Sequence, residues 1–248
     1  MKRIGFTILT IFLFSALLKA DATHDATTSV VTSANTTLHT FSHSNGCSSN
    51  GVIYVFARSR NVANTSASGV TYAGVSLTLI NDSNGVSDVA ADDLWHNAWR
   101  LINPATGANN VIVTLTAASD AILTAMTVCG AHQTTPEGTI VEAQSTNNAT
   151  ASLAVTSETG GLVIDSFIQE GNGADPTMGA LQTERSTNQG ALVETTLDAE
   201  TSTEPGQASV TMSRTSLTTF TDWTFMAIPV RPAPASVALN QNILTRRR

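Results

Sequence analysis

The sequence is poor in charged and in aromatic residues, which make up 12% and 5% of its 248 residues. The 12 Lys and Arg are outnumbered by 19 Asp and Glu, which gives a formal net charge of −7. Binding to nucleic acid without base recognition requires clustered Lys and Arg on the phosphates, so this composition argues against a nucleic-acid partner. The hydrophobic fraction of 42% is too high for a disordered chain. We therefore expect a folded protein with a largely neutral, polar surface.

Lysine is almost absent, because Lys2 and Lys19 are the only two in the chain. From residue 21 onward the sequence holds nine Arg, no Lys and all 19 acids. This excludes a lysine Schiff base, a P-loop lysine and an isopeptide bond between Lys and Asn in that part of the chain. Metalloprotease, thioredoxin-type, serine-hydrolase and phosphate-loop motifs (HExxH, CxxC, GxSxG and Gly-rich loops) are also missing from the sequence.

Residues 1–20 have the pattern of a secretory signal peptide. A basic start at 1–3 precedes an apolar run over 4–18, and small residues allow cleavage after Ala20 or Ala22. An uncleaved N-terminal anchor is the alternative interpretation. No later stretch approaches the 18 apolar residues of a membrane span. The sequence predicts a secreted or cell-surface protein with no membrane span once the signal is removed.

Short apolar or alternating runs recur about every ten residues after the signal, with turn sequences such as Asn84-Gly85 and Pro205-Gly206 between them. This spacing, with no helical periodicity, is typical of an all-β antiparallel sandwich. We expect one sandwich domain over 35–234, a lead-in at 21–34 and a tail at 235–248. Val111, Val113 and Leu115 alternate with polar residues and should share a buried face.

Two runs, 52–57 and 162–164, are instead continuously apolar. Strands that are covered on both faces have this pattern, so both runs predict central strands. The tryptophans Trp99 and Trp223 share strand faces with Leu101 and Phe225, which favours a role as core residues between sheets.

Four blocks resemble, in the same order, the landmarks of a group of secreted bacterial and phage-associated β-sandwich proteins. These blocks are Val70 to Thr78, Trp99 to Gly107, Cys129 to Pro136 and Ser202 to Met212. The resemblance implies a jelly-roll-like sandwich, similar in architecture to concanavalin-A-like lectins and laminin-G-like domains. It implies no single activity, since fold alone does not transfer function.

Oxygen-bearing side chains cluster after residue 80 in a pattern that suits a calcium ion. The candidate ligands are Asp82, Asn84, Asp88, Asp92 and Asp93. Asx-turns and loop solubility explain the same residues without an ion. Calcium is the one cofactor that the sequence suggests.

Trp95 follows this loop and is the one candidate for an aromatic sugar platform beside acidic residues. Cys47 and Cys129 are the only cysteines, and export would place them in an oxidising compartment, so we expect a disulfide between them. Two separate thiols are the alternative.

Catalysis finds little support in the sequence. His39 and His43 lie four residues apart in an expected strand, about 13 Å at ~3.3 Å per residue, too far to hold one ion together. Asp198 and Glu200 have the spacing of paired glycosidase carboxylates but no aromatic neighbour. Eleven acids between residues 137 and 204, beside the single base Arg185, predict a solvated outer face.

The flanks allow two further interactions. Residues 21–34 are either a flexible lead-in or a strand exchanged with a neighbouring subunit, and the basic tail Arg246–Arg248 is either solvated or a weak electrostatic tether. We therefore expect a non-catalytic extracellular structural or adhesive module, such as a subunit of a surface fibre or appendage. A carbohydrate-binding, lectin-like domain with a polysaccharide partner is the alternative, and a glycoside hydrolase is the third candidate.

Overall fold

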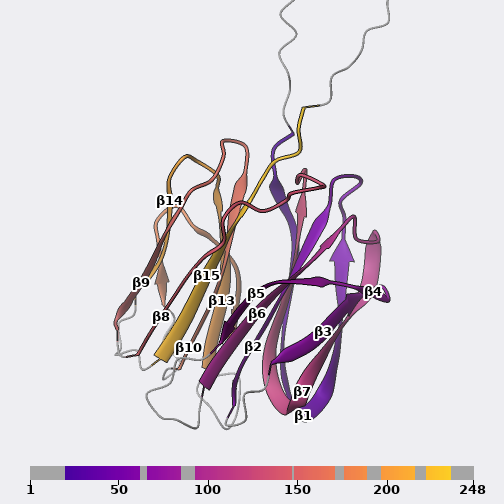
Figure 1. The fold of residues 1–248 in the computed structure, drawn as a ribbon, viewed down its shortest axis with the longest axis vertical. Helices are drawn as coiled ribbons and strands as arrows, with labels where there is room; N and C mark the ends of the chain where they lie inside the picture. Colours follow the sequence, from indigo (N-terminus) through magenta and orange to yellow (C-terminus); the bar gives the residue numbers. More distant parts are fainter. Residues whose placement is uncertain are drawn as a thin grey trace, which may run out of the picture.

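The computed structural model describes residues 20–61, 66–84, 93–146, 148–170, 176–188, 197–215 and 222–235, with backbone alone at 33–35, 61, 84 and 93. All regular structure in these residues is β-strand, paired antiparallel (Figure 1). No helix in this part of the chain is long and apolar enough to cross a membrane. The predicted all-β sandwich class is confirmed, whereas the jelly-roll topology is not confirmed.

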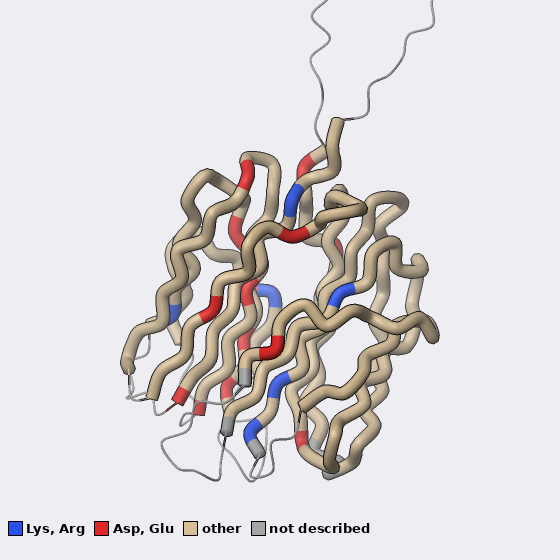
Figure 2. The backbone as a smooth tube through the Cα atoms, viewed as in Figure 1, with Lys and Arg blue, Asp and Glu red and all other residues tan. Residues whose placement is uncertain are grey.

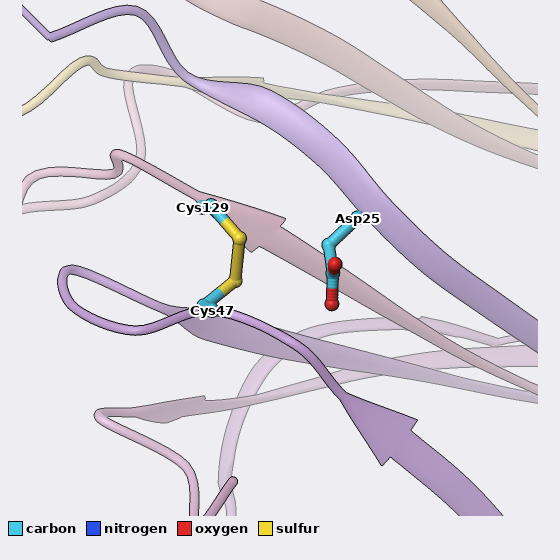
Figure 3. Close-up of side chains that lie close together, drawn as sticks. All are labelled: Asp25, Cys47 and Cys129. Atoms are coloured by element: carbon cyan, nitrogen blue, oxygen red, sulfur yellow. A yellow bond between two sulfur atoms is a disulfide. The ribbon is translucent and has the colours of Figure 1, made fainter. Parts of the chain in front are cut away.

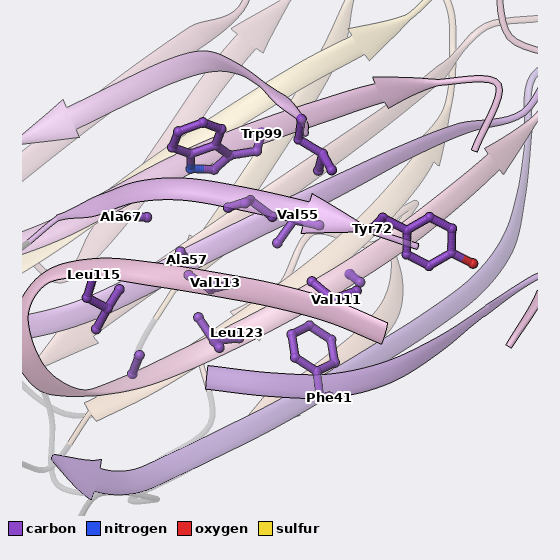
Figure 4. Close-up of a cluster of buried hydrophobic side chains, with 14 of the residues drawn as sticks. Phe41, Val55, Ala57, Ala67, Tyr72, Trp99, Val111, Val113, Leu115 and Leu123 are labelled. Atoms are coloured by element: carbon purple, nitrogen blue, oxygen red, sulfur yellow. The ribbon is translucent and has the colours of Figure 1, made fainter. Parts of the chain in front are cut away.

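The N-terminal half forms one sandwich. Its strands are β1 (Thr23–Asn45), β2 (Val52–Asn61), β3 (Ala67–Tyr72), β4 (Val75–Ser76), β5 (Thr78–Asn84), β6 (Asp93–Ile102) and β7 (Gly107–Cys129). β1 and β7 pair along almost their whole length, with register shifts around Thr32 and Thr36. Both strands bend there, so residues 122–128 of β7 pair with β2 in one layer and residues 111–115 pair with β3 in another. The sheet thereby folds over itself (Figure 4).

The interior of this sandwich is apolar. Phe41, Val55, Trp99, Val113 and Leu123 belong to one buried cluster between the two layers (Figure 4). The predicted buried face of the first part of β7 is confirmed, because all three of its alternating apolar residues are at most 3% exposed. Burial of each such aliphatic or aromatic side chain stabilises the fold by about 1.5–3 kcal/mol.

The C-terminal half forms a second sandwich. Its strands are β8 (Val141–Thr146), β9 (Thr150–Val155), β10 (Leu162–Glu170), β11 (Thr177–Met178), β12 (Thr183–Asn188), β13 (Leu197–Pro205), β14 (Val210–Thr215) and β15 (Asp222–Val230). One sheet has the order β12-β13-β10-β15-β8 and the other has the order β11-β14-β9. Its core lies between these two sheets and includes Leu153, Phe167, Met212 and Phe225.

The two halves have the same order of strand pairings. β10 pairs with β13 and β15 as β2 pairs with β6 and β7, while β8 and β9 together take the place of the bent β1. The turns agree as well: Asn103 N donates to Gly51 O (3.0 Å) in one half, and Gly206 N donates to Gly161 O (2.8 Å) in the other. The chain thus repeats one sandwich unit, which the sequence did not reveal because most matching positions hold different residues.

The two sandwiches stack back to back, which gives four layers (Figure 1). The inner sheets, centred on β2 and β10, enclose an apolar cluster with Tyr54, Phe56, Ile164 and Met226. Every residue of 52–57 and 162–164 is at most 7% exposed. The prediction of central strands covered on both faces is therefore confirmed for both runs, and the cover on one face is the other sandwich.

The described chain begins and ends at the same pole of the molecule (Figure 1). Ala22 N donates to Gly160 O (2.8 Å) of the C-terminal half, and Ala233 N donates to Gly130 O (2.7 Å) of the N-terminal half. Each end of the described chain is therefore hydrogen-bonded to the other sandwich. Residues 23–32 are part of β1 and pair with β7 of the same chain, so the segment expected as a lead-in is part of the fold. Its exchange with a neighbouring subunit would require that pairing to open.

Candidate functional site

Most of the predicted calcium loop lies beyond the described side chains. Asp88 and Asp92 fall in 85–92, which the structure does not describe. At Asn84 and Asp93 only the backbone is described. Asp82 is exposed on β5, and its Oδ1 accepts a hydrogen bond from Asn97 Nδ2 at 2.5 Å. Calcium at this place stays a prediction, with one carboxylate oxygen of Asp82 already engaged.

A groove of about 370 Å³ lies where β5 of the first sandwich runs beside β8 of the second. Its lining consists of Asp82, Ser83, Glu142, Ala143 and Gln144. Asn81 Nδ2 donates to Glu142 Oε2 at 2.9 Å and joins the two strands. The groove therefore offers carboxylates and an amide for hydrogen bonds.

Trp95 does not line this groove, because it is only 3% exposed and belongs to the core of the first sandwich. This burial does not fit the predicted sugar platform. The other aromatic residues in the described part of the chain are equally buried: Phe41, Tyr54, Phe56, Tyr72, Trp99, Phe167, Trp223 and Phe225. None of them presents a ring on which a sugar could stack, and the predicted core role of Trp99 and Trp223 is confirmed.

The structure joins Cys47, before β2, and Cys129, at the end of β7, in a disulfide with their Cα atoms 5.3 Å apart (Figure 3). This is the predicted bridge. Asp25 lies beside it and accepts a hydrogen bond from Gly46 N at 2.7 Å. Asp25 and the two sulfur atoms are the one cluster of metal-ligand atoms among the described residues, but bonded sulfurs offer no thiolate to a metal.

Several acids of the second half are buried, so the predicted solvated face is wrong for Asp165, Asp198, Glu200 and Glu204, none of which is more than 4% exposed. Asp198 Oδ2 accepts a hydrogen bond from Gln169 Nε2 at 3.2 Å. A polymer cannot reach buried carboxylates, so the structure does not place Asp198 and Glu200 where a glycosidase pair would meet its substrate.

A buried arginine forms ion pairs with two of these acids inside the second sandwich. Arg214 Nη2 lies 2.9 Å from Asp165 Oδ1, and Arg214 Nε lies 2.9 Å from Glu200 Oε2. The guanidinium also lies over the rings of Phe167 and Phe225, at 6.0 and 5.3 Å from their centroids. The sequence held a signal for this cluster, since Arg214 continues the inward alternation of Val210 and Met212, and Asp165 interrupts an apolar run.

A second buried network joins the two inner sheets. Arg58 Nη1 donates to Ser166 Oγ (3.1 Å) and to Glu200 O (3.1 Å), and His96 Nε2 lies 2.8 Å from the same Ser166 Oγ. Burial lowers the pKa of Arg58 to about 9, although Asp165 and Glu200 act in the opposite direction. Burial, and then the charge of Arg58, hold the pKa of His96 well below its ordinary value, so this ring is neutral.

The outer sheets carry almost no charge (Figure 2). β3 and β4, and the parts of β1 and β7 that pair beside them (38–45 and 107–115), contain no Lys, Arg, Asp or Glu, and in β9, β11 and β14 the only one is the inward Arg214. Their exposed positions are rich in hydroxyl groups: Thr40, Ser42, Ser44, Ser68, Thr114, Thr150, Ser152, Thr211 and Thr215.

No family model, curated protein or solved structure matches this chain. The resemblance to secreted jelly-roll-like sandwich proteins therefore stays a prediction.

Proposed function

We propose that this protein is a non-catalytic extracellular structural or adhesive module, such as a subunit of a surface fibre or appendage. The supporting observation is the pair of neutral, hydroxyl-rich outer sheets. Surfaces without charge do not repel a second copy or a neutral polymer, and rows of Thr and Ser supply hydrogen bonds.

Apolar side chains on the N-terminal outer sheet add to this surface. Leu38 is 54% exposed on β1 and Val75 is 52% exposed on β4. They stand singly among hydroxyl groups, an arrangement that suits a weak, repeated contact better than a permanent dimer interface.

The placement of both described chain ends at one pole of the molecule supports the same function. The described chain begins and ends at the pole of the disulfide, and the strand ends beside residues 62–65, 85–92 and 216–221 lie at the opposite pole (Figure 1). A module attached at one pole presents the other pole and both outer sheets to a surface.

The test is self-association of the secreted chain at micromolar concentration, followed by sedimentation and negative-stain microscopy. We expect filaments or oligomers whose formation changes little with salt, because their contacts carry no charge. Thr114→Asp, at the centre of the neutral outer sheet, should abolish them. Thr183→Asp, at an exposed position on β12 outside that sheet, is the matched control. Dispersed monomers that also fail to adhere to surfaces would contradict the proposal.

The groove between β5 and β8 favours a second function, the binding of a polysaccharide through hydrogen bonds. A glycan array would test it with Glu142→Gln, which alters the groove lining, and with Glu184→Gln at an exposed position on β12 as the control. Loss of glycan binding in the first variant alone would support the groove. Binding that both variants retain would place the glycan elsewhere.

A further inference from the structure

A side-chain amide lies against a buried hydroxyl and a buried carboxylate in the second sandwich. Asp165 on β10 and Ser202 on β13 face each other in register, and both are completely buried. Gln182, which precedes β12 and is half-buried, covers them. Its Nε2 donates to Ser202 Oγ at 2.8 Å and to Asp165 Oδ2 at 2.9 Å, so the hydroxyl lies beside the amide nitrogen, one bond from Cδ.

The three groups are the components that an acyl transfer requires. Ser202 Oγ donates to Asp165 Oδ2 at 2.8 Å, which places a nucleophile beside a base. Arg214 and the backbone N–H of Ser202 hold the other oxygen of Asp165 at 2.9 and 2.7 Å and fix its orientation.

Two backbone donors point at the oxygen of the amide. Gly179 N and Ser213 N donate to Gln182 Oε1 at 3.0 and 2.8 Å. A pair of fixed N–H groups at this distance stabilises the negative charge that develops on a carbonyl oxygen when a nucleophile attacks its carbon. Gln182 therefore occupies the position of a substrate that belongs to the chain itself.

We propose that Ser202 and Gln182 form an internal ester bond. Ser202 Oγ attacks Gln182 Cδ while its proton passes to Asp165 Oδ2, and the carbonyl electron pair moves onto Oε1 between the two N–H groups. The intermediate then collapses, the Cδ–Nε2 bond breaks, and the nitrogen takes the proton back from Asp165. One hydroxyl and one carboxamide yield one ester and one ammonia, and Asp165 returns to its carboxylate form.

The surroundings favour formation of this bond. Holding the reacting groups together corresponds to effective concentrations of about 10⁵–10⁸ M in well-oriented intramolecular reactions, which lowers the barrier to attack on the amide. Ammonia can leave because Gln182 is half-buried rather than enclosed.

The bond would complete a parallel between the two halves. The first sandwich is closed by its disulfide, and the described residues of the second contain no cysteine. An ester from Gln182 to Ser202 would tie the start of β12 to β13 and give the second sandwich a covalent link of its own. The inference concerns the chemistry of this core and does not depend on the proposed function.

Tryptic peptide mapping of the folded, secreted chain tests the proposal directly. Because no lysine follows residue 19, trypsin cuts in this region only after Arg100, Arg185 and Arg214, which places Gln182 and Ser202 on different peptides. After reduction of the disulfide we expect peptides 101–185 and 186–214 to run as one species, lighter than their sum by one ammonia. Hydroxylamine, which cleaves esters, should separate them.

Two variants should lose the link. Ser202→Ala removes the nucleophile and Gln182→Glu removes the reactive amide, so both should give separate peptides. Ser186→Ala, which removes another hydroxyl between β12 and β13 (Ser186 Oγ lies 2.7 Å from Thr201 Oγ1), should keep the link. The mapping of the unaltered protein decides the question even if a variant fails to fold. Separate peptides from that protein, whether unmodified or with Gln182 deamidated, would overturn the proposal.

Discussion

The two sandwiches share their order of strand pairings but differ in what fills them. Val55 of β2 lies opposite Trp99 of β6 in the first sandwich, and both belong to its apolar core. At the matching positions of the second, Asp165 of β10 lies opposite Ser202 of β13. The first part of β7 ends its inward row with Leu115, whereas β14 ends its inward row with Arg214.

This difference shows that one chain topology can be stabilised in two ways. An apolar interior gains free energy from burial and tolerates exchanges of similar volume. A buried polar interior contributes less net stability and depends on every partner, because a single loss leaves an uncompensated charge. The second sandwich should therefore respond more strongly to a single substitution of a core residue.

Removal of the buried arginine should have the largest effect. Arg214→Met leaves the buried Asp165 and Glu200 without the positive charge of Arg214, so the free energy of unfolding should fall by about 5 kcal/mol. The double variant Asp165→Val, Arg214→Leu introduces the residue types of the first sandwich and keeps Arg58 beside Glu200. It should recover part of the loss. Urea unfolding measures both values, and equal losses in the two variants would contradict the argument from buried charge.

Removal of the disulfide should have the next largest effect, on the first sandwich. Cys47 and Cys129 are 82 residues apart, and release of a loop of that length costs about 4 kcal/mol in the chain-entropy estimate. The variant Cys47→Ala, Cys129→Ala should lose that amount, measured by urea unfolding. The unaltered protein under reducing conditions is the control and should behave in the same way. An unchanged midpoint of unfolding would show that the bridge contributes no stability.

The sequence predicted the strands better than it predicted their stacking. Alternation identified the inward face of β7, and continuous apolar runs identified β2 and β10, because burial acts on each strand separately. The repeat and the four layers were missed because pairing between distant strands leaves no local pattern. The bend that divides β1 and β7 between two layers likewise follows from their register shifts and from no single residue.

The site was harder to predict than the fold. Regular spacing of acids suggested a solvated face, yet Asp165 and Glu200 are buried beside Arg214, which follows them in the sequence by 49 and 14 residues. Only the paired strands bring them together. Trp95 lies close in sequence to a cluster of acids, but its ring packs into the core. The cysteines were paired from their number, from the expected oxidising compartment and from their places at the ends of expected strands.

Acid should weaken the first sandwich through His43. This ring is buried between the hydroxyls of Thr28 and Thr127, and burial lowers its pKa to about 4, with Asp25 raising it and His24 lowering it. In the unfolded chain the pKa is about 6.5. Stability is therefore complete above pH 6.5 and is lost as the pH falls to 4, since the unfolded chain takes up the proton first. The loss from this group is roughly 3 kcal/mol.

Urea unfolding between pH 7 and 4 measures this loss. His43→Gln keeps a polar side chain between the two hydroxyls and cannot take up the proton, so its stability should decline less over the same range. An identical decline in the variant and in the unaltered protein would assign the acid sensitivity to other groups, such as His96, whose pKa burial also lowers.

The smallest expected effect compares the turns that lead into the two central strands. Asn50 and Gly160 occupy matching positions before β2 and β10, with φ of 52° and 80°. A Cβ on Gly160 would lie 2.7 Å from Asp21 Oδ1 and would hold a left-handed conformation, so Gly160→Ala should cost about 1–2 kcal/mol. Asn50→Gly relieves a conformation that Asn already tolerates and adds freedom to the unfolded chain, so its effect should stay within about 0.5 kcal/mol of zero. Urea midpoints at a constant m value measure both effects. Equal effects would contradict the argument that the turn before β10 requires glycine.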